Sequence, residues 1–317
     1  LVPFARNYMD VVLPVSAPRA GEAGAALSAR MFLNEQEPLQ LGIYANGADL
    51  KGVTVTVDPL KDSSGRTVAE SEVRVAEYSL VKGWNIRNYF VEPFPQRLWP
   101  AYAFDVPAGR SQMLLITLKT DEKNSRAGKY KAAVRIKAAK SGGFEETAVP
   151  LELEILDRRL LTMKEAGLKL GGCTNGLIPE FEMEWLTQNN HNMVNIWYQS
   201  DRPEMKKNGG SFEMDFRLMD EFMLSAKRAG MTDMVYFLGG NPYGFPRTMH
   251  LPRILAQTML GLDDRGWSEL AFRNPDNVPP EVAPYIVEWA RRFRAHADSA
   301  GWPNVILTPF DEPAKWH

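Results

Sequence analysis

Two adjacent carboxylates near the end of this sequence are its residues best suited to acid–base chemistry. Asp311 and Glu312 follow an apolar segment, residues 304–310, and lie between Phe310 and Pro313. Like charges this close raise one another's pKa, and burial raises it further. A carboxylic acid that stays protonated near neutral pH can serve as a general acid. The alternative is structural: Asp311 caps a following helix, and Glu312 is a solvated residue of its first turn.

Aromatic and amide side chains follow the other apolar segments of the second half of the chain. Sugar rings present apolar C–H faces that stack on aromatic rings, while their hydroxyl groups need amide and carboxyl partners. The candidates for sugar binding are Asn175, Trp197, Tyr198, Asn241, Tyr243 and Trp316. A plain core position is the alternative for each aromatic residue, and Tyr236 is expected to be core. Trp197 and Tyr198 are consecutive in a strand, so at most one of them faces a pocket.

Other residue types that often serve in catalysis or ligand binding form no recognisable motif in this sequence. Cys173 has no signature of a nucleophile, and we expect a buried thiol without a role. The pair Gly239-Gly240 is neither a dinucleotide-binding GxGxxG motif nor a phosphate-binding loop. Four His residues are too few for a His-rich metal cluster, and His296 is expected on the solvent side of a helix. We therefore predict no cofactor and no metal site.

The composition excludes several classes of protein. The chain has 317 residues, with 37 Lys+Arg against 39 Asp+Glu, and so a formal net charge of −2. Without an excess of positive charge, no basic field attracts nucleic acid or an anionic membrane. No apolar run reaches the roughly 18 residues of a membrane span, and a single Cys cannot form an intramolecular disulfide. The length predicts about two domains.

The first half of the chain has the pattern of β-strands. Apolar and polar residues alternate at 53–57, 130–137 and 149–155, which places one row of side chains inside and the other in water. Turn-forming pairs such as Asn46-Gly47 separate these segments. No long amphipathic helix is expected in this half. We therefore predict a β-sandwich domain over residues 1–160.

The second half changes to alternating strands and helices. Short apolar segments predict strands at 168–173, 193–198, 233–238 and 304–310. Apolar residues at helical spacing predict helices at 180–190, 215–230, about 252–260 and 282–297. This alternation indicates a parallel sheet, whose reactive groups lie at the carboxyl ends of the strands. We predict a multidomain β plus α/β chain in which residues 161–317 form the first half of a (β/α)8 TIM-type barrel, truncated after strand four. A complete small open sheet is the alternative.

Four segments of the chain resemble a known family. NEQEPLQLGIYA (34–45), VPAGRSQMLLITLKT (106–120) and AGKYKAAVRI (127–136) resemble an N-terminal β-sandwich attached to secreted bacterial glycoside hydrolases. The ending VILTPFDEP (305–313) resembles the fourth barrel strand of glycoside hydrolase family 123 and its uncharacterised relatives. Members of this family look like β-N-acetylgalactosaminidases. The resemblance spans both halves of the chain, although many barrel glycosidases carry an acid at the end of strand four.

The resemblance implies an exo-acting β-N-acetylhexosaminidase that uses substrate-assisted, retaining catalysis. Glu312 would protonate the leaving glycosidic oxygen and then activate water. Asp311 would orient the substrate's own 2-acetamido group, whose oxygen attacks the anomeric carbon. An adjacent pair suits this scheme, because neighbours on one strand end lie on the same side of the scissile bond. A direct retaining mechanism needs a carboxylate on each side.

The resemblance also implies a carbohydrate or glycoconjugate partner and a secreted, periplasmic or cell-surface location. We expect the 317 residues to be inactive alone, with a further C-terminal segment or a second chain completing the barrel. Two rival functions stay open. One is a glycosidase of the same architecture without an acetamido requirement. The other is a non-catalytic carbohydrate-binding surface protein, in which Asp311 and Glu312 only cap a helix.

Overall fold

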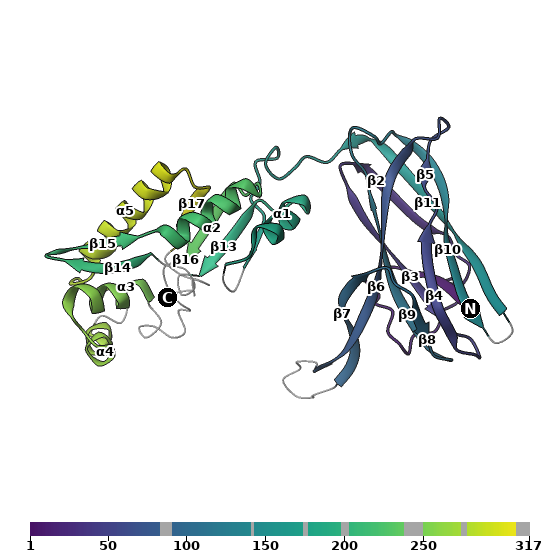
Figure 1. Ribbon diagram of the computed structural model, residues 1–317, viewed down its shortest axis with the longest axis horizontal. Helices are drawn as coiled ribbons and strands as arrows, with labels where there is room; N and C mark the ends of the chain where they lie inside the picture. Colours follow the sequence, from purple (N-terminus) through teal and green to yellow (C-terminus); the bar gives the residue numbers. More distant parts are fainter. Residues whose placement is uncertain are drawn as a thin grey trace. The chain divides into compact units, whose positions relative to one another are not determined.

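The protein divides into two compact units, Leu1–Leu160 and Leu161–His317. The computed structural model describes residues 1–82, 91–140, 143–173, 177–197, 203–237, 250–273 and 278–308. Strands dominate this part of the chain, and Figure 1 labels the elements of each unit. Each unit has its own hydrophobic core.

Unit 1 contains two sheets. The six-stranded sheet has β1 (Val2–Arg6), β3 (Gln36–Tyr44), β9 (Ser111–Lys119), β6 (Thr67–Lys82) and β5 (Leu60–Lys61) in spatial order, with β7 (Val91–Pro100) also paired to β6. The five-stranded sheet has β2 (Leu27–Leu33), β11 (Gly143–Arg159), β10 (Gly128–Lys140), β4 (Leu50–Val57) and β8 (Phe104–Val106). Neighbouring strands are antiparallel except β2 and β11, which run parallel.

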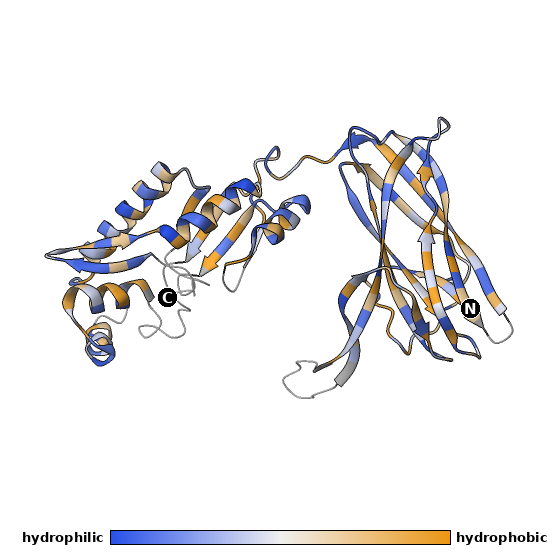
Figure 2. Ribbon diagram, viewed as in Figure 1, coloured by the Kyte–Doolittle hydropathy of each residue, from blue (hydrophilic) through white to orange (hydrophobic). Residues whose placement is uncertain are grey.

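Alternating side chains of both sheets form the core of unit 1. The predicted strands at 53–57, 130–137 and 149–155 are confirmed as parts of β4, β10 and β11. Most of their inward residues are buried as expected, with Val134 and Leu151 fully buried, whereas Val57, Tyr130 and Ala132 are half-buried against the core. Figure 2 shows the resulting change between hydrophobic and hydrophilic residues along the strands. The opposite sheet contributes Leu41, Ile43, Leu114 and Ile116 to the same cluster.

A buried ion pair and a buried amide fasten the N-terminal segment of unit 1. The Arg6 guanidinium donates from Nε and Nη2 to the two carboxylate oxygens of Glu22, at 2.8 and 2.7 Å. Only 3% of the Arg6 side chain and 15% of the Glu22 side chain are exposed. Gln40 donates to the carbonyl oxygens of Asn7 and Asp10 and accepts from the Val12 amide. These bonds satisfy polar groups that would otherwise be costly to bury.

Unit 2 is built on a parallel sheet whose strands lie in chain order. These are β12 (Gly171–Cys173), β13 (Met193–Trp197), β16 (Asp233–Phe237) and β17 (Asn304–Thr308). They confirm the four strands predicted for this half. The helices are α1 (Glu180–Gln188), α2 (Arg217–Arg228), α3 (His250–Leu255), α4 (Asp264–Phe272) and α5 (Ala283–Ala300), with a π-helical turn at Ala256–Leu260. Gly230 and Gly301 follow α2 and α5 with positive φ, as helix-ending glycines do.

The helices of unit 2 pack on one face of the sheet. Their buried side chains share a single core with the strand residues Val194, Ile196, Met234, Tyr236 and Val305. The strand residues between these, such as Asn195, Val235 and Ile306, face the other side and are only half-buried. Parallel sheets normally have both faces covered. The described part of unit 2 therefore leaves one sheet face incompletely covered.

Two features of unit 2 have no counterpart in the sequence prediction. A β-hairpin of β14 (Glu204–Asn208) and β15 (Ser211–Asp215) precedes α2, and α4 follows the predicted helix near 252–260.

Gly171 also has a role that was not foreseen. A Cβ at this position would collide with the backbone carbonyl oxygen of Met193, so β12 approaches β13 more closely than another residue allows. Within the described ranges, no helix has the length and apolar character needed to cross a bilayer.

Candidate functional site

The strand ends of the parallel sheet lie along one edge, as the predicted site requires. The register pairs Trp197 of β13 with Phe237 of β16, and Phe237 with Thr308 of β17, while Cys173 of β12 lies opposite Asn195. The segments that follow these ends contain the predicted site residues. Seven of the eight predicted site residues lie outside the described residues: Asp311, Glu312, Asn175, Tyr198, Asn241, Tyr243 and Trp316. Trp197 is the last residue of β13, and the structure describes only its backbone.

A polar network at the opposite edge of the sheet ties the beginnings of the strands together. The buried Asp233 carboxylate, at the start of β16, accepts hydrogen bonds from Asn304 Nδ2 at 2.6 Å and Thr232 Oγ1 at 2.8 Å, and it pairs with Lys169 ahead of β12. Asn192, ahead of β13, accepts from the Leu170 amide through Oδ1 at 2.9 Å. Each of the four strands therefore contributes to a network that fixes their register.

The charge of Asp233 is stabilised by this network. Burial alone would raise the pKa of its carboxyl group. The hydrogen bonds from Asn304, Lys169 and Thr232 outweigh burial and hold that pKa below its ordinary value of 3.8. Asp233 is therefore a structural anion. In barrels, this edge of the sheet serves stability, whereas the opposite edge serves chemistry.

His296 corrects one expectation from the sequence, because it does not simply face solvent. Its Nε2 lies 2.8 Å from Asp220 Oδ1, and Trp302 Nε1 donates to the same oxygen at 2.8 Å. Its ring also stacks on Phe216, with centroids 3.9 Å apart and planes inclined by 6°. A carboxylate that orients an imidazole is found in catalytic bases. Here the pair lies among α2, α5 and the segment before β17, on the helical side of the sheet, and it joins those elements.

Tyr236 is a core residue, as predicted. It is fully buried, and its ring lies 5.1 Å from Phe293 and 6.1 Å from Trp289, centroid to centroid. These aromatic rings lie between the sheet and α5. The face of β16 that carries Tyr236 is therefore filled by packed side chains. A pocket at the sheet must lie on the other face or at the strand ends.

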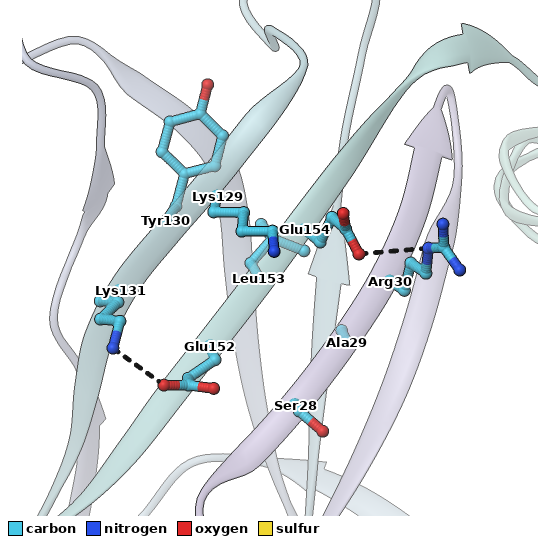
Figure 3. A pocket seen from close by; sticks show the side chains of 9 residues that line it. All are labelled: Ser28, Ala29, Arg30, Lys129, Tyr130, Lys131, Glu152, Leu153 and Glu154. Carbon is cyan, nitrogen blue, oxygen red and sulfur yellow. Dashed lines mark ion pairs between the residues drawn. The ribbon is translucent and has the colours of Figure 1, made fainter.

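A hollow on the surface of unit 1 is lined by charged residues, in contrast to the aromatic core around Tyr236. It has a volume of about 410 Å³ and is lined by charged side chains of β2, β10 and β11 (Figure 3). Lys131 pairs with Glu152 at 3.1 Å, and Arg30 pairs with Glu154 at 3.2 Å. Because cations and carboxylates neutralise one another across the strands, this surface has the character of a solvated sheet face. Within the described residues, no three His, Cys, Asp or Glu side chains converge as metal ligands would.

The polar network was not predicted from the sequence, although the sequence contains a signal for it. Asn192, Asp233 and Asn304 each stand at or directly before the first residue of an apolar strand. A polar residue at that position in successive strands can meet its counterparts, since parallel strands begin at one edge. The His296 contact has no such signal, because its partner Asp220 is 76 residues away and on a separate element.

Comparison with known proteins gives a likeness of fold. No protein-family model matches the chain, and no curated protein matches it. Among solved structures, a family 123 glycoside hydrolase from Clostridium perfringens aligns over 89% of this chain, with 10% identity and a TM-score of 0.60. The CooA pilin subunit of enterotoxigenic Escherichia coli aligns over 50% of this chain with 13% identity, but its TM-score of 0.27 is too low to support an inference. The alignment covers 54% of the Clostridium protein, so this chain has the fold of a family 123 glycoside hydrolase over about half of that protein's length.

Proposed function

We propose that this protein is a glycoside hydrolase. The observation that carries the proposal is the fold shared with the Clostridium perfringens enzyme along 89% of the chain, through both units. The Clostridium enzyme is described as acting in the hydrolysis of glycolipid glycans. At 10% identity the fold does not transfer a substrate, so the substrate class is argued from the residues at the strand ends.

The proposed architecture is an N-terminal β-sandwich followed by the first half of a (β/α)8 barrel. Two sheets around one core support the sandwich. For the barrel, support comes from parallel strands in chain order whose described helices pack on one face. Polypeptide outside these 317 residues would supply the remaining strands and close the sheet.

Asp311 and Glu312 are the proposed catalytic pair. They follow Thr308, the last residue of β17, by three and four positions, and this strand end shares an edge with those of β12, β13 and β16. Glu312 acts as the general acid and then as the general base. Asp311 holds the 2-acetamido group of the substrate while its oxygen attacks the anomeric carbon. An adjacent pair favours this exception to the two-carboxylate scheme, which places its carboxyl groups on both sides of the bond.

The proposed substrate is a terminal β-linked N-acetylhexosamine, galacto-configured by analogy with family 123, on a polysaccharide or glycoconjugate. Asn175, Trp197, Tyr198, Asn241, Tyr243 and Trp316 are proposed to bind it. They belong to the strand ends or to the segments that follow them. Such substrates lie outside the cell or in the periplasm, so we also propose an exported protein.

The test of substrate and mechanism compares two substrates that differ in one group. The complete protein is assayed on 4-nitrophenyl N-acetyl-β-galactosaminide and on the corresponding plain β-galactoside. Substrate-assisted catalysis predicts hydrolysis of the first only, because the second lacks the attacking acetamido oxygen. Comparable rates on both would favour a glycosidase with an enzymic nucleophile. Glycan binding without hydrolysis of either would favour a carbohydrate-binding protein.

A further inference from the structure

Two polar side chains lie on the face of the parallel sheet that the described helices leave incompletely covered. Val194 and Ile196 flank Asn195 in β13 and belong to the core shared with the helices. Leu307 packs against the same core and directly precedes Thr308, the last residue of β17. Because successive side chains of a strand point to opposite faces, Asn195 and Thr308 lie on the incompletely covered face. Both are half-buried, and we call them the open-face pair.

The open-face pair belongs to the carboxyl ends of the strands. The register places Thr308 level with Trp197, the last residue of β13, through Phe237 of β16. Asn195 lies two residues before Trp197, which is about 7 Å along the strand. In the sequence, Asp311 follows Thr308 by three positions. Both polar side chains are therefore at the sheet edge after which the catalytic pair is proposed.

The amide of Asn195 is unusual for the interior of a strand. Asn is depleted in strands, and burying an amide among apolar groups costs free energy. In the register, its row continues through Val235 and Ile306, which are apolar. Strand β13 pairs with β12 on one side and with β16 on the other, so the main chain at this point has its hydrogen-bonding partners in the ladder. Departures from the apolar pattern that the fold does not require are typical of functional sites.

Residues of the same two types at the opposite edge of the sheet have structural roles. Asn192 accepts from the Leu170 amide at 2.9 Å and donates to the Leu168 carbonyl oxygen at 2.8 Å, both in the segment before β12. Thr232 donates to the Asp233 carboxylate at 2.8 Å. These side chains satisfy polar groups at the starts of the strands. The open-face pair lies instead towards the edge that serves chemistry in a barrel.

We propose that the open-face pair binds the sugar residue whose glycosidic bond is cleaved, with the Asn195 amide and the Thr308 hydroxyl as hydrogen-bonding partners of its hydroxyl groups. This inference rests on the proposed function. An amide and a hydroxyl each donate and accept, as sugar hydroxyls do. The described strands of this sheet contain no Lys or Arg, so the surface suits an uncharged ring better than an anionic ligand. The two residues are two strand spacings apart, roughly 10 Å, a distance that one sugar and its acetamido group can span.

Substitutions that keep the size of the side chain and remove its hydrogen-bonding groups test this proposal in the complete protein. Asn195→Leu and Thr308→Val change the open-face pair. Asn192→Leu and Thr232→Val are the matched controls, because they make the same exchanges at the other edge of the sheet. Each variant is compared with the wild type in kcat and KM on 4-nitrophenyl N-acetyl-β-galactosaminide, in the binding of N-acetylgalactosamine by isothermal titration calorimetry, and in urea unfolding.

For each open-face variant we expect kcat/KM to fall roughly 10–100-fold, the effect of losing one or two hydrogen bonds to the ligand, and the Kd of N-acetylgalactosamine to rise in the same range. Resistance to urea should stay the same or increase, because an apolar group replaces a polar one of similar shape. The two controls should lose resistance to urea and keep the wild-type KM. Open-face variants with wild-type kcat/KM and sugar binding would overturn the proposal. A loss of urea resistance equal to that of the controls would assign the pair to the fold and overturn it too.

The binding measurement separates this inference from the proposed hydrolase. A complete protein that binds N-acetylgalactosamine without hydrolysing any glycoside, and loses that binding in the open-face variants, would refute the hydrolase and support the open-face pair as a sugar site. Hydrolysis and sugar binding that neither variant weakens would keep the hydrolase and overturn the inference. A complete protein that binds neither N-acetylgalactosamine nor N-acetylglucosamine would overturn the inference as well.

Discussion

Asp233 shows how a single buried carboxylate organises unit 2. Its oxygens take hydrogen bonds from Thr232 and Asn304 and an ion pair from Lys169, so it links β16 to β17 and to the segment before β12. Breaking a buried pair leaves donors without acceptors, which costs more than the pair itself contributes. The residue is therefore worth more to the fold than an exposed ion pair.

Replacing Asp233 by Ala should destabilise unit 2 by about 2–4 kcal/mol, since a buried charged acceptor is lost and its donors are stranded. Urea unfolding followed by Trp fluorescence measures the change. Glu269→Ala is the matched control, because Glu269 pairs with the exposed Arg265 and exposed pairs contribute about 1 kcal/mol or less. Equal losses in the two variants would show that the network does not stabilise the sheet.

Glu22 gives unit 1 a pH dependence. The hydrogen bonds from Arg6 are the main cause that lowers the pKa of Glu22 to about 2. In the unfolded chain a Glu has a pKa of about 4.3. A lowered pKa in the folded state means that the stabilisation is complete above the unfolded value and is lost as the pH falls towards 2.

Stability measurements from about pH 5 down to about pH 2 test this dependence, with chemical denaturation followed in the wild type and in Glu22→Gln. The wild type should lose stability more steeply than the variant over this range, because Gln at this position does not titrate. Glu152→Gln serves as the control, since Glu152 pairs with the exposed Lys131 on the surface. Parallel pH curves for the wild type and Glu22→Gln would contradict the assignment.

At the scale of secondary-structure elements, Gly171 determines how closely β12 approaches β13. Gly171→Ala should destabilise unit 2 by about 1–3 kcal/mol, the usual cost of overpacking, and should release the pairing of β12 with β13. Hydrogen exchange at residues 193–195 reports that pairing. The control is Gly172→Ala, whose added methyl group meets nothing within 4 Å. Equal exchange in both variants would show that the collision is relieved without loss of pairing.

Elements with a clear periodicity were predictable from the sequence, and weakly patterned ones were not. The alternation in β4, β10 and β11 and the helical spacing in α2 and α5 identify those elements, because one face of each is buried. The hairpin β14–β15 escaped prediction because charged and polar residues fill most of β14, and only Phe212 in the pair is fully buried. The hairpin also contacts α5, where Arg292 donates to Ser211 Oγ at 2.8 Å.

The edge of the sheet that the predicted site requires was predictable from the sequence, whereas the site residues themselves stay a prediction. Parallel strands in chain order bring the ends of β12, β13, β16 and β17 to one edge, and the sequence alone places Asp311 and Glu312 after the last of them. The detailed positions of side chains around a sugar depend on contacts among several loops. Such contacts join residues far apart in the chain, and local pattern does not encode them.

On the scale of the whole molecule, the described residues leave one face of the parallel sheet incompletely covered and give each edge strand a single strand partner. The described helices cover one face, and β12 and β17 each have a single strand partner among the described strands. A barrel resolves both features, since closure pairs the edges and turns the open face into a filled interior. Together with the shared fold, this is the basis for proposing a hydrolase whose catalytic pair follows β17.

The most direct test of the central claim is the Glu312→Gln variant of the complete protein, assayed on N-acetyl-β-galactosaminides whose leaving groups differ in basicity. Loss of a general acid removes about 10²–10⁴-fold in rate. The loss should be largest for poor leaving groups, which need the proton, and smallest for nitrophenol, which does not. The matched control Glu281→Gln alters an exposed carboxylate ahead of α5 and should leave all rates unchanged. A Glu312→Gln enzyme with wild-type turnover on every substrate would contradict the proposed role of this residue.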